Sequence, residues 1–194
     1  MIGRPDFDAI ASWIRSGSRV LDLGCGNGDL LKYLTDRRAA NGYGVEICDE
    51  NLLASVRSGA NVIQMDLESG LSVFESHSFD YVILSQTLQA VHRTELIVRE
   101  MLRVGKEGIV TFPNFGYWQH RLDVLRGRMP VSEDLPYQWY DTPNIHLCTL
   151  KDFETFCARL RVRIVERRVL TRGRSIQARA NFFGSIAVYR LRAG

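Results

Sequence analysis

The sequence predicts an α/β protein built on one doubly wound sheet of seven strands, with an antiparallel last strand. Two observations predict this fold. Short apolar runs of strand character alternate with amphipathic helical runs as far as Asn114, and such alternation gives parallel βαβ units. The last two strand-like runs are joined by a connection that is too short for a helix, and strands joined in that way pair antiparallel.

The expected strands are short runs rich in aliphatic and aromatic residues, bounded by glycine, proline or polar turns. The first ends at Gly24, and the fifth is stopped by Pro113, which cannot donate to a strand ladder. In chain order the expected strands are residues 18–24, 42–47, 60–66, 79–88, 107–114, 161–170 and 182–191.

The expected helices lie between these strands, where apolar side chains recur at intervals of three and four residues. Thr149 is a good N-cap for the last helix, and Phe153 and Phe156 lie on its apolar face. In chain order the expected helices are residues 5–15, 27–38, 48–59, 93–105 and 149–160.

Residues 114–148 interrupt the alternation and show no regular period. An irregular stretch of that length within a compact domain is either functional or evidence that an element has been assigned wrongly. This one carries Tyr137, Trp139 and Tyr140 between two prolines. Because the chain has 194 residues, about the size of one domain, we expect residues 1–194 to form a single domain with an aromatic-rich insertion at about 114–148.

The composition is that of a globular protein, with 45% hydrophobic residues, 24% charged residues and a net charge of +3. No apolar run approaches the roughly 20 residues that a membrane span needs, and the N-terminus has no apolar signal core. We therefore expect a cytoplasmic protein without a membrane partner. The four cysteines have no CxxC spacing, so we expect neither a disulfide framework nor a metal site.

The segment 159–179 is rich in arginine. Arg161 and Arg163 alternate with apolar residues, as on a strand with one solvated face. No aromatic residue that could stack on a base is interleaved with these arginines before Phe182, so we do not expect a nucleic-acid surface. The role of this segment is left open by the sequence.

Ligands of open α/β sheets bind beyond the carboxyl ends of the strands. The first strand ends in the loop VLDLGCGNG, residues 20–28, whose glycines let the chain turn tightly and let a ligand touch the backbone. The second strand ends in Glu46, about 20 residues after the first glycine, where an acid can hold a ribose diol. Asp66 ends the third strand, and Ser85 and Gln86 end the fourth.

Two ligand classes compete for this edge of the sheet. A dinucleotide needs the spacing GxGxxG, which seats its pyrophosphate on a helix N-terminus. The loop here reads GxGxG, and Asp22 precedes it, so its carboxylate would repel a pyrophosphate. Asp22 instead suits a ligand that carries an ammonium group.

The loop and the three acids resemble motif I and the following strand ends of the class I S-adenosylmethionine-dependent methyltransferases. The resemblance implies the Rossmann-like fold of that class and a bound S-adenosylmethionine or S-adenosylhomocysteine. It places Asp22 near the methionine moiety, Glu46 on both ribose hydroxyls and Asp66 near the adenine amino group. The expected cofactor-binding residues are Asp22, Gly24, Cys25, Gly26, Asn27, Glu46, Ile47, Met65, Asp66, Leu67, Ser85 and Gln86.

The segment FPNFGYWQHRLDVLRGRMPVSEDLPYQWYDTPNIHLCT, residues 112–149, resembles the methionine biosynthesis protein MetW family, and with the RVLDLGCGNG start the similarity runs over essentially the whole chain. The family has the methyltransferase fold and is associated with a homoserine O-acyltransferase. The resemblance therefore implies a MetX-type acyltransferase as partner. It does not establish a methyl acceptor.

Three interpretations of residues 112–149 are open. The aromatic side chains, among them Tyr117, Trp118, Trp139 and Tyr140, could form a lid that excludes water from the ligand. They could form a partner surface, since tryptophan and tyrosine are common hot-spot residues. They could also pack against the sheet edge with their polar tips in water.

The acceptor half of a methyltransferase site is not recognisable. Weak candidates for a catalytic base are His92, Tyr117, His120 and His146, with His92 the best placed in sequence, and SQTL stands where some methyltransferases carry DPPY or NPPY. Two functions therefore stay open. One is a methyltransferase-fold protein that binds S-adenosylmethionine and supports a homoserine O-acyltransferase; the alternative is an active methyltransferase on a small acceptor.

Overall fold

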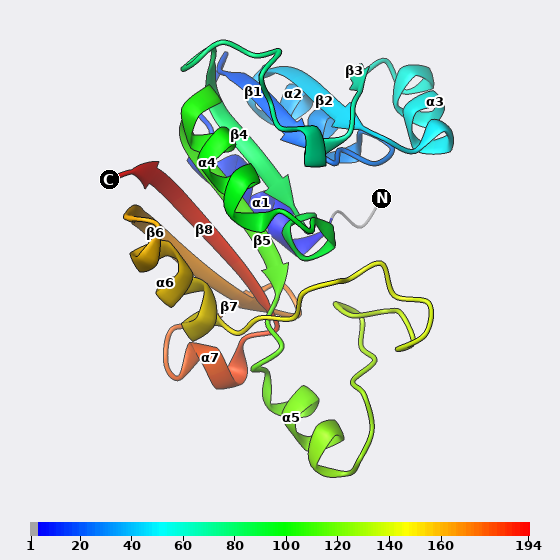
Figure 1. Cartoon of the computed structure of the whole chain (residues 1–194), viewed down its shortest axis with the longest axis vertical. Coiled ribbons are helices and arrows are strands. Elements are labelled where there is room, and N and C mark those ends of the chain that lie inside the picture. The colour runs from blue at the N-terminus through cyan, green and yellow to red at the C-terminus, as the bar shows by residue number, and fades with distance from the viewer. Residues whose placement is uncertain (1–3) are drawn as a thin grey trace.

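The computed structural model describes residues 4–194 and contains one mixed sheet of eight strands in the order β3-β2-β1-β4-β5-β8-β6-β7 (Figure 1). The first five strands are parallel, and β8 pairs antiparallel with both β5 and β6. The strands are β1 (Arg19–Leu23), β2 (Asn41–Glu46), β3 (Asn61–Gln64), β4 (Phe79–Ser85), β5 (Gly105–Pro113), β6 (Val162–Thr171), β7 (Arg174–Ser175) and β8 (Ile186–Ala193). The predicted doubly wound sheet with a reversed last strand is confirmed, and the eighth strand is the two-residue β7.

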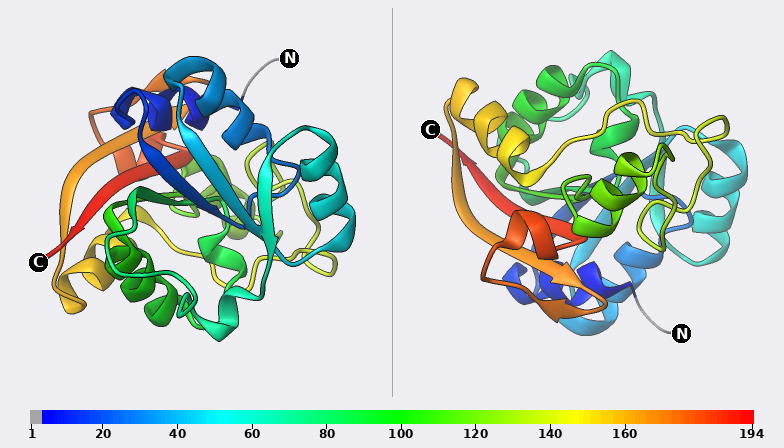
Figure 2. Two further views of the ribbon diagram at one scale, coloured as in Figure 1. Left: turned by 90° about the horizontal axis from the view of Figure 1, so that it is seen from above. Right: turned by 90° about the horizontal axis from the view of Figure 1, so that it is seen from below.

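Helices cover both faces of the sheet. The helices are α1 (Pro5–Trp13), α2 (Asp29–Arg38), α3 (Asp49–Arg57), α4 (Thr94–Val104), α5 (Trp118–Leu125), α6 (Leu150–Arg159) and α7 (Ala180–Phe183), with short 3-10 turns η1 (Leu67–Ser69) and η2 (Leu88–Ala90). Figure 2 shows α1 and α2 on one face and α4 and α6 on the other. No helix of residues 4–194 is both long enough and apolar enough to cross a membrane.

Two apolar cores fill the space between the helices and the sheet. On one face, Ile10 of α1 and Leu34 of α2 pack on β-strand residues such as Ile83. On the other face, Phe112, Phe153 and Tyr189 form an aromatic cluster with ring centroids 4.7 to 5.9 Å apart. Burial of such rings is a large part of the hydrophobic stabilisation of a domain. The helical periodicity in the sequence predicted these faces correctly.

The chain between β6 and β8 differs from the prediction. A strand was expected over 182–191, but Phe182 and Phe183 belong to α7 and the strand begins at Ile186. The side chain of Asn114 donates hydrogen bonds to the carbonyls of Asn181 (3.2 Å) and Gly184 (2.7 Å), so the chain is held in a turn there. The connection also has room for β7 and α7, so the prediction of a connection too short for a helix was wrong.

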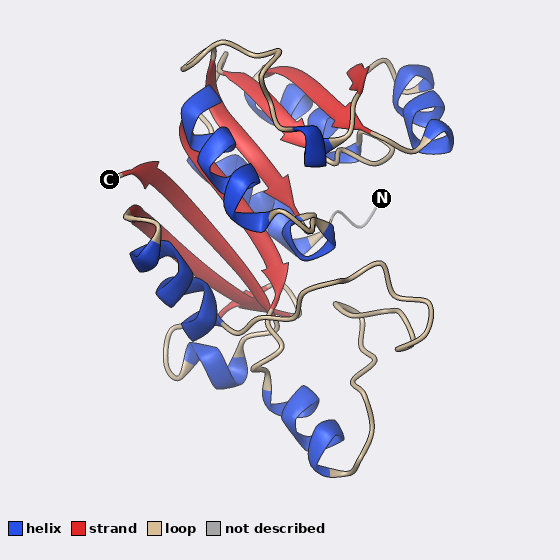
Figure 3. Cartoon of the chain, viewed as in Figure 1, coloured by secondary structure: helices blue, strands red, loops and turns tan. Residues whose placement is uncertain are grey.

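The irregular segment after β5 contains one helix that the sequence pattern did not indicate, α5, followed by a long stretch drawn as loop in Figure 3. Both ends of this stretch are bonded to the body of the protein. The ring of His120 lies 3.1 Å from the carbonyl of Asn114 and 3.0 Å from the hydroxyl of Ser132. The backbone amides of Ile145 and His146 both donate to the carbonyl of Gln89, at 2.8 and 2.9 Å.

The predicted N-cap of α6 leads to a test of stability. The Thr149 hydroxyl accepts from the Asp152 amide and the Asp152 side chain accepts from the Thr149 amide, which is a capping box. Thr149→Ala should lower the free energy of unfolding by about 1 kcal/mol in chemical denaturation, because a helix cap is lost. The control is Thr155→Ala, inside the same helix, where the hydroxyl only bonds the carbonyl of Lys151. Equal effects of the two changes would contradict a capping role.

Candidate functional site

The glycine loop follows β1 at the point where the strand order reverses, between β1 and β4. Ligands of such sheets bind at this switch point. The amides of Gly24 and Cys25 donate to the carbonyl of Val45 at 2.8 and 3.0 Å, so the loop folds back over β2. Gly24, Gly26 and Gly28 have φ angles of +73°, +56° and +82°, which other residues rarely adopt.

The glycines differ in what lies beside them. A Cβ at Gly24 would come within 2.6 Å of Thr87, and a Cβ at Gly28 would come within 3.2 Å of Ala60 and Ser55. A Cβ at Gly26 would meet no atom of residues 4–194 within 4 Å. The positive φ favours glycine at this position, and the side on which a Cβ would stand is free for a ligand to approach.

Glu46 anchors the loop from the end of β2. One carboxylate oxygen accepts from the Gly26 amide at 2.8 Å, and the other accepts from the amides of Ile47 and Cys48 at 2.9 Å each. Its side chain is buried, yet a carboxylate has about four acceptor positions. Three are used, so the carboxylate can accept a further hydrogen bond from a hydroxyl group.

Asp22 is the most buried acid of the strand ends, with 1% of its surface exposed. Its Oδ1 atom has no hydrogen-bond partner within the part of the chain that the structure describes. Burial raises the pKa of Asp22 to about 7, while nearby Arg4 acts to lower it and the carboxylates of Asp6 and Glu46 raise it further. An unpartnered buried carboxylate is costly, and a bound ammonium group would remove that cost.

The remaining strand ends offer a shallower surface. Asp66 is exposed and its Oδ1 accepts from the Glu68 amide at 2.9 Å, so it caps η1. Ile47 is exposed beside Glu46, whereas Met65 and Leu67 are partly buried against the core. The structure therefore brings these four predicted residues to one edge of the sheet, and it gives Asp66 a capping role in addition.

Four other predicted cofactor residues make contacts within the protein. The Cys25 thiol is buried, its pKa is raised to about 12 by burial, and it fills the space above Gly44. Asn27 bonds Asp29, its neighbour at the start of α2. The Ser85 hydroxyl accepts a hydrogen bond from the Arg4 side chain at 2.8 Å, and the backbone amide of Gln86 donates to the Thr111 carbonyl at 3.0 Å. Any cofactor contact of Cys25 would therefore come from its backbone.

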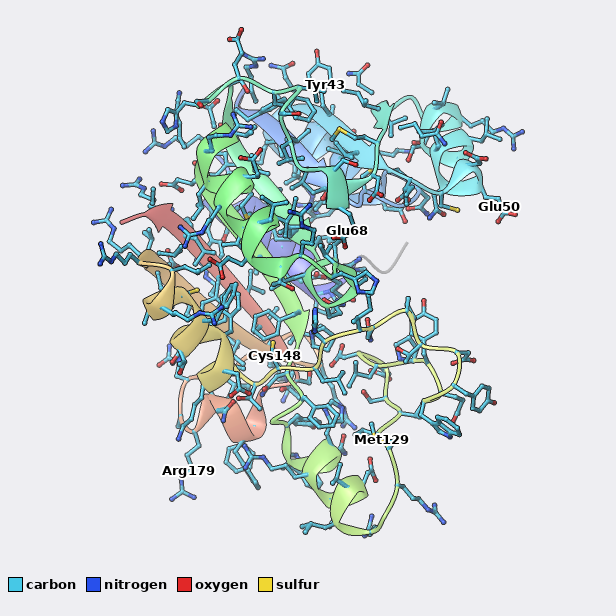
Figure 4. The ribbon with its side chains drawn as sticks, in the orientation of Figure 1. Tyr43, Glu50, Glu68, Met129, Cys148 and Arg179 are labelled. Atoms are coloured by element: carbon cyan, nitrogen blue, oxygen red, sulfur yellow. The ribbon has the colours of Figure 1, made fainter. Side chains whose placement is uncertain are left out.

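The structure does not assemble the four candidate bases into one group. His92 and His146 are exposed, and the backbone amide of His92 donates to Glu68, which is labelled in Figure 4. His120 is buried with both ring nitrogens in hydrogen bonds, and burial lowers its pKa. Tyr117 is buried and packs edge-on against the His120 ring at 5.4 Å. His120 and Tyr117 therefore have structural contacts that account for them.

The sequence prediction missed an ionic cluster at the N-terminus of α1. Asp6 is fully buried and is paired with Arg4 through two hydrogen bonds, the shorter at 2.6 Å. Asp6 also accepts from Ser85 (3.5 Å) and Thr111 (3.2 Å), which stand side by side on β4 and β5. Ser85 and Thr111 lie about 80 or more residues from Asp6 in sequence, so no local pattern could have indicated their part in the cluster.

The aromatic residues of the loop after α5 divide into buried and exposed groups. Tyr117 is buried, but Trp139 and Tyr140 are each 71% exposed and contact each other edge to face at 5.6 Å. Tyr137 and Leu147 are also exposed. Self-packing against the sheet therefore does not explain Trp139 and Tyr140.

Comparison with known families gives one match over almost the whole chain. The family model described as methionine biosynthesis protein MetW matches residues 4–191. A bifunctional methionine biosynthesis protein MetXA/MetW from Rhodopirellula baltica is 43% identical over 171 residues, which cover 83% of this chain and 27% of that protein. A ubiquinone biosynthesis O-methyltransferase from Neisseria meningitidis is 33% identical over 103 residues, covering 50% of this chain and 43% of its own length. The chain thus spans less than half the length of these relatives.

Solved structures share the fold at low sequence identity. An S-adenosylmethionine-dependent methyltransferase from Mesorhizobium loti superposes with a TM-score of 0.72 at 17% identity, with 98% of each chain covered. One from Archaeoglobus fulgidus gives 0.69 at 14% identity, covering 97% of this chain and 94% of its own. These likenesses confirm the class I methyltransferase fold.

The raised pKa of Asp22 predicts how stability depends on pH. Asp22 has a pKa of about 7 in the folded chain, whereas its ordinary value is 3.8. The folded state therefore binds the proton of this carboxyl group more tightly than the unfolded state does. Its stabilising contribution is complete below pH 3.8 and is lost as the pH rises to 7. Between pH 5 and pH 8 the loss is roughly 2–3 kcal/mol.

Asp22→Asn should remove this dependence. Denaturant unfolding of both proteins at pH 5 and pH 8, without ligand, should show that the wild type loses roughly 2–3 kcal/mol more than the variant. Comparing two pH values cancels any constant packing effect of the substitution. Parallel pH profiles for the two proteins would mean that Asp22 titrates normally.

Proposed function

Since the chain belongs to the methionine biosynthesis protein MetW family, we propose that it binds S-adenosylmethionine or S-adenosylhomocysteine and supports a homoserine O-acyltransferase in methionine biosynthesis. The observation that carries the binding part is the group formed by Asp22, Gly26 and Glu46. Among residues 4–194, Asp22 is a buried acid whose Oδ1 has no partner, Gly26 is open on one side, and Glu46 retains acceptor capacity. Asp22 is complementary to an ammonium group, and Glu46 to a ribose hydroxyl. Gly26 leaves room for a ligand to lie close to the backbone.

Each residue has a distinct role in this proposal. Asp22 pairs with the ligand ammonium group, and Glu46 accepts from the ribose while keeping its bonds to the loop. Asp66 would receive the adenine amino group, and the exposed Ile47 beside Glu46 would offer an apolar contact to the ligand. When bound, S-adenosylmethionine supplies a methyl group activated by its sulfonium.

The accessory role is favoured over catalysis by the positions of the candidate bases. His92 and His146 are exposed, while His120 and Tyr117 are packed within the segment after β5. None of the four has a contact that orients it for proton removal beside Asp22 in residues 4–194. The alternative, an active methyltransferase on a small acceptor, therefore has less support.

The partner part rests on a relative and on a surface. The Rhodopirellula baltica relative joins MetXA and MetW in one bifunctional protein, which supports an association with a MetX-type acyltransferase. Within residues 112–149, Trp139 and Tyr140 are large, exposed and held on an anchored segment. Such residues contribute most of the binding energy when an interface covers them.

Glu46→Gln should weaken S-adenosylhomocysteine binding about tenfold or more in titration calorimetry. The neutral amide has one acceptor oxygen where the carboxylate has two, so the variant loses the charge-assisted bond to the ribose and some of the bonds that hold the loop in place. The control is Glu50→Gln, which removes the same charge in the first turn of α3. Unchanged affinity in the Glu46 variant would remove Glu46 from the site, and no binding by the wild type would refute the cofactor proposal.

Trp139→Ala and Tyr140→Ala should each weaken the complex with a homoserine O-acyltransferase by ~2 kcal/mol or more if they are interface hot spots. Binding of S-adenosylhomocysteine should not change. Tyr43→Ala is the control, since Tyr43 is 40% exposed and lies at the opposite end of the molecule from Met129 of the segment after β5 (Figure 4). Normal partner binding with lost ligand binding would favour a lid instead.

A further inference from the structure

A cavity of about 410 Å³ lies beside the proposed cofactor site. It is bounded by the start of α1, residues 131–134 and the turn between β6 and β7. Of the twelve predicted cofactor residues only Gln86 lines it, so it is a separate space next to the end of β4. Its volume is within the range of small-molecule sites.

One wall of the cavity carries two arginines, Arg4 and Arg172, together with the buried Asp6. Arg4 is fixed there by its two bonds to the buried Asp6 and by its bond to Ser85, which leave its Nη1 group without a partner in residues 4–194. Arg172 lies in the β6–β7 turn, and a Cβ at the next residue, Gly173, would lie 4.0 Å from Pro5. The turn therefore packs beside the start of α1, and Arg4 and Arg172 both line the cavity where these two segments meet.

The other wall is anionic. Glu133 and Asp134 come from the loop after α5, which is held in place by the bond between the His120 ring and Ser132. Asp134 is half-buried, and burial raises its pKa. A half-buried carboxylate of this kind gains from an opposite charge brought by a ligand.

The two walls do not neutralise each other. No ion pair within 4.0 Å involves Arg172, Glu133 or Asp134 among residues 4–194, and Arg4 pairs only with Asp6. A phosphate or other simple anion would face the acids, and a simple cation would face the arginines. A small ligand that carries one charge of each sign matches both walls.

We propose that this cavity binds a free α-amino acid, with its carboxylate on Arg4 and Arg172 and its ammonium group on Asp134. The bidentate fork of an arginine fits a carboxylate, and the fixed orientation of Arg4 lowers the entropy lost on binding. Glu133 adds negative charge on the side of the ammonium group. The site does not depend on the cofactor proposal, because its charged residues are not those of the cofactor group.

The proteinogenic L-amino acids are the probes, titrated singly into the full chain by calorimetry or ligand-observed NMR. For any that binds, the matching amine without the carboxylate and the matching acid without the amine should each bind about tenfold or more weakly. Failure of every amino acid to bind, or equal binding of either analogue, would overturn the proposal.

Two variants assign the two ends of the ligand. Asparagine tolerates the φ of +49° at position 172. Arg172→Asn should therefore weaken binding of the amino acid about tenfold or more and leave binding of the amine unchanged. Asp134→Asn should weaken the amino acid and leave the deaminated acid unchanged. Arg174→Asn removes a charge from the same hairpin outside the cavity and should have no effect. An equal loss of affinity for all probes in one variant would indicate a structural effect and count against the assignment. The affinity of the same variants for S-adenosylhomocysteine tests the cofactor site separately.

Discussion

The carboxylate of Glu46 is the interaction on which the ligand edge of this protein depends. It accepts three backbone amides from two different segments, the glycine loop after β1 and the start of α3. Few apolar contacts hold these segments, because the loop is rich in glycine and Ser55 is the one buried residue of α3. The acid at the end of β2 therefore acts with the bonds of Gly24 and Cys25 to Val45, and with the bond from the Ser55 hydroxyl to the Gly26 carbonyl, to fix where the backbone of Gly26 lies. Charge-assisted bonds to backbone amides are among the strong hydrogen bonds of proteins, so this arrangement is well defined before any ligand binds.

The same edge holds two buried acids that differ in how far the protein compensates their charge. Asp6 is fully buried but is compensated by Arg4, Ser85 and Thr111. Asp22 is also buried, and within the described part of the chain its Oδ1 lacks such compensation. An uncompensated carboxylate next to a compensated one is hard to explain by packing, since an asparagine or a leucine would fill the same volume at lower cost. Stability given up at one residue is typical of a position selected for binding.

Much of this architecture could be predicted from the sequence. The alternation of strands and helices indicated the sheet, and the spacing of Asp22, Glu46 and Asp66 placed three acids at one edge. Both signals are local and periodic. The Arg4–Asp6 cluster could not be predicted, because its partners Ser85 and Thr111 come from strands far along the chain. The helix at 180–183 was missed for a similar reason, since the long-range bonds of Asn114 hold that turn and Phe182 and Phe183 favour a strand by propensity.

The attachment of the segment after β5 has a consequence for its evolution. Its distal end is held by the backbone amides of Ile145 and His146, which share the carbonyl of Gln89. A backbone amide is present in every residue except proline, so this anchorage does not depend on which side chains occupy the two positions. Exposed side chains such as those of Trp139 and Tyr140 can therefore change without breaking this distal anchor. Related chains could keep one loop path while changing the surface it displays, and a new specificity could arise there through side-chain substitutions alone.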